Sequence, residues 1–168
     1  QKRFHMWQEQ NPGMHTGKAK PKQITDSFVW PAYDQRGVVT QLLEVKRLRD
    51  ILPHIPGREL VVQAGGNVGV FPARLAEHFN RVITFEPDKA NFSCLVQNVG
   101  TNPKILAYNA ALGEHVGTCG VEKHEPTNAG QVWVVAGDDI SMRTIDSLEL
   151  PACDLIWLDV EGYEAKAL

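Results

Sequence analysis

The chain has 168 residues, of which 43% are hydrophobic and 22% charged, and its formal net charge is −3. These values fit one globular domain with a single core and favour neither a nucleic-acid nor a membrane partner. No apolar run is long enough to span a membrane, and the three cysteines are too scattered for a disulfide framework or a zinc site. We therefore expect a cytoplasmic protein with reduced thiols.

Two regions are expected along the chain: an irregular N-terminal arm over 1–35 and a folded domain over 36–168. Residues 1–22 carry a local charge of +4, which leaves −7 on the remainder. A basic arm can contact phosphate or an acidic partner, although a solvated terminus explains the same charges. The folded region opens with an amphipathic pattern that predicts a helix over 38–52, ended by Pro53.

Short apolar runs between turn residues predict the strands, and helically spaced apolar residues predict the helices. Strands are predicted over 58–64, 81–86, 104–108 and 154–159, the last of them buried; helices are predicted over 70–79 and 88–99 and from Gly162 onward. Two further strands, over 116–123 and 131–135, are expected to pair with each other, and 144–148 to form a short turn or helix. The alternation of strands and helices predicts an α/β fold whose mostly parallel sheet has helices on both faces.

A glycine-rich turn, AGGNVG, ends the first strand and opens the next helix. Gly65, Gly66 and Gly69 let a ligand approach the backbone, and the start of the helix offers free N–H groups. A tight turn without a ligand would use the same residues. Glu86 then ends the second strand, 20 residues after Gly66. At that place in α/β nucleotide-binding folds, an acid accepts hydrogen bonds from both ribose hydroxyls of an adenosine.

Two classes of adenosine ligand fit this pattern, namely nicotinamide or flavin dinucleotides and S-adenosylmethionine. A pyrophosphate site prefers the spacing GxGxxG, which AGGNVG matches poorly. S-adenosylmethionine carries no phosphate, so its loop needs less strict spacing. The pattern favours S-adenosylmethionine and leaves a nicotinamide-dependent oxidoreductase as a rival.

Five segments, in the same order along the chain, resemble the FkbM-type methyltransferases from about Val61 to Leu168: QAGGNVGVFPARLA, VITFEPDKANFSCLVQNV, NAALGE, TIDSL and DLIWLDVEGYEAKAL. The resemblance implies a Rossmann-like class I methyltransferase fold over 36–168, with S-adenosylmethionine as cofactor. It also implies which residues contact the cofactor. Gly65, Asn67 and Gly69 would line its methionine part, and Glu86 would hold the ribose. Pro87 would shape the turn beneath the adenine, and Asn109 and Ala110 would contact the adenine edge. Gln63 stands where the family usually has an acid that helps to bind the amino group or to orient the loop, so this contact would lack its charge.

A second polar cluster, Asp159, Glu161 and Glu164, follows the DLIWLD strand. Ligands of open α/β sheets bind beyond the carboxyl ends of the strands, and the resemblance implies that Asp159 and Glu161 lie at the active site, with Asp159 beside the methyl donor. The pair can act as bases or hold a metal, but no third ligand is evident and no metal is expected. His124 is a further candidate base; a surface loop explains His124 equally, and a helix-start acid explains Glu161 and Glu164.

The expected reaction is O-methylation of a hydroxyl on a small molecule or sugar, with nucleic acid not expected as a partner. Gln63 leaves room for an alternative, a catalytically degenerate domain that binds a nucleoside or a protein. The family domain normally continues past DVEG with a full helix and further strands. We therefore expect the domain to be truncated at the C-terminus, or the apolar edge of the DLIWLD strand to be covered by a homo-oligomeric or other partner.

Overall fold

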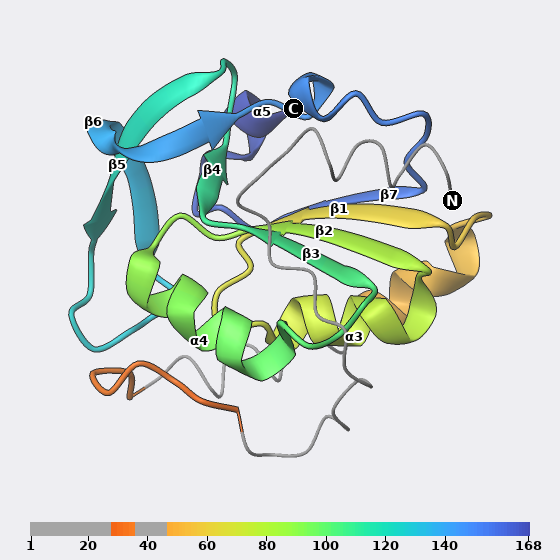
Figure 1. Ribbon diagram of the computed structural model, residues 1–168, viewed down its shortest axis with the longest axis horizontal. Helices are drawn as coiled ribbons and strands as arrows, with labels where there is room; N and C mark the ends of the chain where they lie inside the picture. Colours follow the sequence, from red (N-terminus) through yellow and green to blue (C-terminus); the bar gives the residue numbers. More distant parts are fainter. Residues whose placement is uncertain (1–27, 36–46) are drawn as a thin grey trace.

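The centre of the computed structural model, which describes residues 28–35 and 47–168, is a parallel sheet with the strand order β3-β2-β1-β7 (Figure 1). Its strands are β1 Leu60–Ala64, β2 Arg81–Phe85, β3 Ile105–Tyr108 and β7 Leu155–Leu158. In register, Val62 lies beside Ile83 of β2 and Ile156 of β7. The parallel sheet with alternating helices confirms the predicted α/β class, and strand order reverses between β1 and β7.

The longer helices, α3 Val70–His78 and α4 Lys89–Val99, cover one face of this sheet (Figure 1). Leu75 of α3 and Leu95 of α4 are fully buried and pack against Val61 and Val82 of the strands. The predicted cap of α4 is confirmed, because the Asp88 carboxylate accepts hydrogen bonds from two backbone N–H groups of the first turn, at 2.9 and 3.0 Å.

Helical structure also precedes β1 on the same face. Residues 38–46 of the helix predicted over 38–52 lie outside the described residues. The chain is α-helical from 47 to 51, and the 3-10 helix η1 Leu52–His54 follows. The α-helix thus ends before Pro53, as predicted, and Leu48 anchors it in the core.

Short elements cover the opposite face of the sheet. They are β4 Ala110–Leu112, the 3-10 helix η2 Asp146–Leu148 and α5 Glu164–Ala167. Leu148 and Ala167 bury themselves there against Val62 and Ile83. Helices therefore lie on both faces, as predicted. The last one begins at Glu164 and not at Gly162, whose φ of +89° is outside the helical range.

A second sheet, in the order β4-β6-β5, stands beside the carboxyl ends of the parallel strands (Figure 1). β5 Gly117–Lys123 pairs antiparallel with β6 Val132–Arg143, which confirms the predicted pairing. β6 extends well beyond the predicted end at residue 135. Strand β4 was not predicted; it begins at Ala110, two residues after the end of β3.

Strand β7 is less buried than its sequence indicated. The apolar run predicted a buried strand, yet the Ile156 side chain is 39% exposed. The cause is topological, because β7 is the edge strand of the described sheet and pairs with β1 on one side.

Residues 28–35 form no regular element and pack against α4. The Asn98 side chain accepts a hydrogen bond from the Val29 N–H and donates to the Val29 carbonyl, at 2.8 and 2.9 Å. Phe28 and Trp30 cover an apolar cluster that includes Val68. In the described part of the chain, no helix combines the length and apolar character that crossing a membrane requires.

Candidate functional site

A cavity of about 190 Å³ opens at the carboxyl ends of the parallel strands, between the two sheets. Four stretches of chain form its wall: the turn after β1, the end of β2 with the start of α4, the loop that leads into β6, and the segment after β7. Its lining residues are Gly65, Asn67, Glu86, Pro87, Asn91, Asn128, Ala129, Gly130, Gln131, Val132, Val134, Asp159, Val160 and Glu161. Carboxyl ends at a reversal of strand order are the usual ligand site of open α/β sheets.

Gly65 brings the turn after β1 close to the segment after β7. Its φ is +86°, and a Cβ built there would lie 2.0 Å from the backbone oxygen of Asp159. The N–H groups of Gly65 and Gly66 both donate to the Phe85 carbonyl, at 3.1 and 2.9 Å. Only glycine fits this close approach of three strand ends.

The other two glycines of the turn, Gly66 and Gly69, have structural roles. A Cβ on Gly66 would lie 2.7 Å from both Leu95 Cδ1 and Thr84 Oγ1, and Gly69 is the N-terminal cap of α3 with a φ of +95°. Neither glycine lines the cavity. In the structure Gly66 and Gly69 have packing and capping roles, and of the three glycines only Gly65 lines the cavity.

Asn67 lines the cavity and carries an unsatisfied buried acceptor. The residue is 5% exposed, and its Oδ1 atom is buried without a hydrogen-bond partner. Its φ of +46° lies in the left-handed region, which asparagine tolerates better than most residues. Buried polar atoms are nearly always paired, so an orphaned acceptor in a cavity wall fits a ligand donor.

Glu86 is a buried carboxylate next to Asn67. It is 4% exposed, and its two oxygens accept hydrogen bonds from the backbone N–H groups of Asn67 and Asp88, at 2.7 and 2.9 Å. Burial raises the pKa of Glu86 to about 7 and outweighs the opposite effect of these two donors and of a third, the Asn91 side chain. A carboxylate has about four lone-pair sites, so the side chain can still accept from a ligand hydroxyl.

Asp159 and Glu161 lie at the mouth of the cavity, and both are exposed. The Asp159 N–H donates to the Ala64 carbonyl at 3.1 Å, which holds it beside the end of β1. Partial burial raises the pKa of Glu161, and the nearby charges of Asp159 and Glu164 add to this effect. The structure thus brings the predicted pair together with Glu86 around one cavity.

Glu164 has a structural place. Its Oε1 atom accepts hydrogen bonds from the N–H groups of Val160 and Gly162, at 3.0 and 3.3 Å, and hydrogen bonding from backbone N–H groups lowers its pKa. These contacts match the helix-start interpretation of this acid. Within residues 28–35 and 47–168, no three His, Cys, Asp or Glu side chains are arranged to hold a metal ion.

Gln63 does not reach the cavity. It is fully buried within β1, where its Oε1 accepts from the Thr84 hydroxyl and its Nε2 donates to the Ala64 carbonyl at 3.0 Å. Both ends of the amide therefore have hydrogen-bond partners in the core. Burying a neutral amide costs less free energy than burying a charged carboxylate at the same place.

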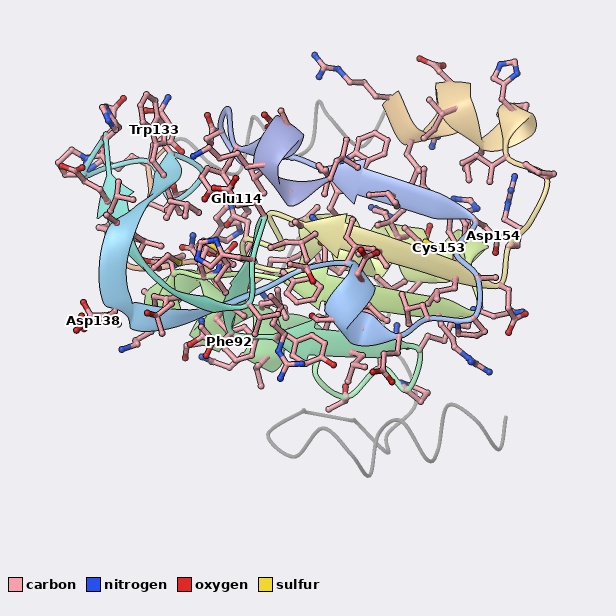
Figure 2. All side chains as sticks on the ribbon, turned by 90° about the horizontal axis from the view of Figure 1, so that it is seen from above. Phe92, Glu114, Trp133, Asp138, Cys153 and Asp154 are labelled. Carbon is pink, nitrogen blue, oxygen red and sulfur yellow. The ribbon has the colours of Figure 1, made fainter. Side chains whose placement is uncertain are left out.

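Asn109, Ala110 and His124 also lie outside the lining. The Asn109 amide donates to the carbonyls of Glu86 and Pro87, at 2.9 and 3.1 Å, so it supports the turn after β2 from behind. Ala110 is buried in β4. His124 is exposed, directly follows β5 and packs its ring 3.8 Å from that of Trp133. Figure 2 shows Trp133 at the opposite end of the molecule from Asp154.

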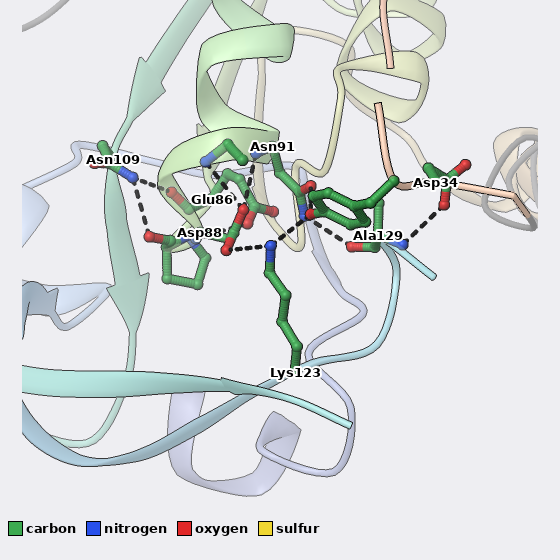
Figure 3. A network of polar contacts seen from close by, with 10 residues as sticks. Asp34, Glu86, Asp88, Asn91, Asn109, Lys123 and Ala129 are labelled. Carbon is green, nitrogen blue, oxygen red and sulfur yellow. Dashed lines mark hydrogen bonds and ion pairs between the residues drawn. The ribbon is translucent and has the colours of Figure 1, made fainter. Parts of the chain in front are cut away.

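Sequence reasoning missed Asn91, which lines the cavity and is 1% exposed. Its Nδ2 donates to the Ala129 carbonyl at 2.7 Å, in a network that also contains Asp34, Asp88 and Lys123 (Figure 3). The sequence offered one signal for Asn91, namely a polar residue on the buried side of the first turn of a predicted helix. Its partner lies 38 residues away, so spacing alone could not find the contact.

This geometry defines a class of protein: an α/β domain with a crevice of about 190 Å³, a glycine turn and a buried acid at the carboxyl ends of its strands. The comparison with protein families then identifies the family. The profile described as "Methyltransferase FkbM domain" matches residues 63–168, which is more than half of the chain. The chain belongs to the FkbM methyltransferase family, which confirms the resemblance found in the sequence.

Among solved structures, the chain is similar to the "putative RNA methyltransferase PH1948 from Pyrococcus horikoshii", with 21% identity and a TM-score of 0.34. That similarity covers 64% of this chain and 50% of the other, so the chain spans half the length of that structure. No curated protein matches the sequence.

Proposed function

We propose that the chain binds S-adenosylmethionine in this cavity and transfers its methyl group to a hydroxyl of a small molecule or sugar. The observation that carries the proposal is that two residues lie in one wall of the cavity: Glu86, with a buried carboxylate, and Asn67, whose Oδ1 atom has no hydrogen-bond partner. A ribose offers two adjacent donors, which a carboxylate can accept together. Family membership over residues 63–168 supports the methyl-transfer part of this proposal.

The residues of the cavity divide into two ends. Glu86 and Asn67 form an inner end that would hold the nucleoside, with Pro87 beneath it. Asp159 and Glu161 form the outer end, where an acceptor would meet the activated methyl group that the cofactor supplies when bound. A carboxylate at the mouth can take up the proton that a hydroxyl loses. Holding the acceptor in line with the donor is the larger contribution expected of such a site.

The charges of the lining define the acceptor class further. Glu86, Asp159 and Glu161 line the cavity, and no lysine, arginine or histidine of the described residues does. Anionic acceptors such as sugar phosphates would be repelled by the two carboxylates at the mouth. We therefore expect neutral polyols or amino sugars to be better acceptors than their phosphorylated or carboxylated counterparts.

The rival functions are separated by thermal-shift titration with S-adenosylmethionine, S-adenosylhomocysteine and NAD. A protein that binds a ligand in its native state melts at a higher temperature in its presence. We expect the first two compounds to raise the melting temperature and NAD to leave it unchanged. Stabilisation by NAD alone would favour an oxidoreductase, and the absence of any shift would favour the degenerate domain.

Catalysis is tested with Asp159→Asn, using a labelled methyl donor and a panel of polyhydroxylated acceptors. The variant should bind S-adenosylmethionine within about twofold of wild type, while transfer falls by roughly 100-fold or more, the usual effect of losing a general base. Asp138→Asn, an exposed acid on β6, is the matched control. Wild-type turnover by Asp159→Asn would refute the role of this carboxylate.

A further inference from the structure

The peptide groups of Ala129 form part of the cavity wall and are held from both sides. Ala129 is fully buried and lines the cavity. Its N–H donates to Asp34 Oδ1 at 2.8 Å, and its carbonyl accepts from Asn91 Nδ2 at 2.7 Å (Figure 3). The loop after β5 therefore depends on two side chains from other parts of the chain for its position.

One of these side chains comes from the segment that precedes the folded domain in sequence. Asp34 lies 95 residues before Ala129, and the neighbouring Gln35 N–H donates to the Thr127 carbonyl at 2.9 Å. At its other end, the segment is held on α4 by Asn98. Residues 28–35 thus connect α4 to the loop that closes the cavity.

The same network reaches the buried acid of the cavity. Lys123 Nζ lies 3.1 Å from Asp88 Oδ2 and 2.5 Å from the Tyr33 hydroxyl, which in turn donates to Asn91 Oδ1 at 3.3 Å. The Asp88 N–H donates to Glu86. The wall loop and the carboxylate expected to hold the ribose are therefore positioned by one set of contacts.

The loop faces the inner end of the cavity. A Cβ built on Gly130 would lie 3.7 Å from Asn67 Nδ2, so the backbone after Ala129 stands opposite the glycine turn. A shift of this loop would widen the space next to Asn67 and Glu86. It would leave the mouth, formed by residues 159–161, in place.

We infer that Asp34 and Asn91 are positioning residues for the nucleoside end of the cofactor site, acting through the Ala129 peptide. The inference rests on the proposed function for its ligand, but the position of the loop is measurable without one. Asp34 acts as an acceptor and Asn91 as a donor. The two roles predict different responses to conservative replacement.

The test compares Asp34→Ala, Asp34→Asn and Asn91→Ala in their dissociation constants for S-adenosylmethionine. Asp34→Ala and Asn91→Ala should bind about tenfold more weakly, as expected when a buried peptide group loses its partner. Asp34→Asn should stay within about twofold of wild type, because its amide oxygen still accepts from the Ala129 N–H. Equal weakening by Asp34→Ala and Asp34→Asn would overturn the acceptor role.

Asp154→Ala is the matched structural control. The Asp154 carboxylate also accepts from backbone N–H groups, those of Glu59 and Leu60 at 2.7 and 2.9 Å, but at the opposite end of β1 (Figure 2). It should lower the melting temperature without changing the dissociation constant. If Asp34→Ala lowers only the melting temperature as well, its role is structural and the inference is wrong.

Amide hydrogen exchange in the ligand-free protein separates this inference from the proposed function. Asp34→Ala should speed exchange at the amides of residues 129–131 by at least about tenfold, and Asp154→Ala should not, because exchange reports local opening. Unchanged exchange in Asp34→Ala would overturn the positioning role whether or not the cofactor binds. Faster exchange in a protein that fails to bind S-adenosylmethionine would support the positioning role and reject only the proposed ligand.

Discussion

Glu86→Gln tests the chemistry of the cavity through the pH dependence of stability. Burial raises the pKa of this carboxyl group from 4.5 to about 7 in the folded protein. The folded state therefore binds a proton more tightly than the unfolded state does. The contribution of Glu86 to the free energy of unfolding is complete below about pH 4.5 and is lost as the pH rises through 7.

The expected size of this effect follows from the two pKa values. Each pH unit between them corresponds to about 1.4 kcal/mol, so ionisation of Glu86 costs roughly 3 kcal/mol of stability in total. Between pH 5 and pH 8, wild type should lose about 2 to 3 kcal/mol more than Glu86→Gln, which has no charge to bury. The amide of the variant will face one of the two backbone N–H donors, which lowers stability at every pH, so the pH slopes are compared and not the absolute values.

The assay is urea unfolding at several pH values between 5 and 8, with Glu122→Gln as control because Glu122 is an exposed glutamate on β5. The control should keep the wild-type slope. S-adenosylmethionine binding to wild type should also strengthen as Glu86 ionises, since the carboxylate is the better acceptor for the ribose hydroxyls. Titration of the ligand itself is common to wild type and Glu86→Gln and cancels in the comparison. Parallel stability slopes for wild type and Glu86→Gln would refute the burial argument.

Three further variants test the wall of the cavity and the predicted base that lies outside its lining. Gly65→Ala should lower the free energy of unfolding by several kcal/mol, because the added Cβ meets the Asp159 carbonyl. Gly162→Ala is the control: its φ is a similar +89°, but the space around it is open, so urea unfolding should show a loss of only about 1 kcal/mol. Equal losses in the two variants would contradict the close approach at Gly65. Asn67→Gly keeps the left-handed backbone and removes the orphaned Oδ1, so calorimetry should find S-adenosylmethionine bound about five- to tenfold more weakly, and unchanged affinity would remove this atom from the site. His124→Ala should keep turnover within about twofold of wild type in the labelled-donor assay, and a larger loss would return this residue to the reaction.

The sequence predicted the inner end of the cavity because local spacing encodes it. A strand, a glycine turn and a helix place Gly65 and Asn67 together, and the parallel register of β1 with β2 then brings Glu86 beside them. Asp159 follows from the same rule, since β7 is parallel to β1 and ends at the same edge. For these residues, knowing the strand ends was sufficient.

Side-chain direction explains why three of the predicted site residues lie outside the cavity lining. Gln63 precedes the turn by two residues, yet its amide points into the core, where Thr84 satisfies it. Asn109 turns back to the carbonyls of the strand end, and His124 turns outward to Trp133. Position near a strand end indicates which edge a residue occupies, whereas the neighbouring strands determine the direction of its side chain.

The α/β class and a crevice at the carboxyl ends of the strands were predictable from the sequence alone, because strand period, glycine turns and strand-end acids are local properties; the FkbM resemblance came from five segments in order along the chain, and the family match over residues 63–168 confirms it. Only the tertiary structure decided how the crevice is closed. Asp34, Asn91 and Ala129 meet across 95 residues of chain, and no periodicity or motif records such a contact. Hydrogen bonds of this kind depend on how separate elements pack against one another, and the local sequence of a single element does not specify that packing.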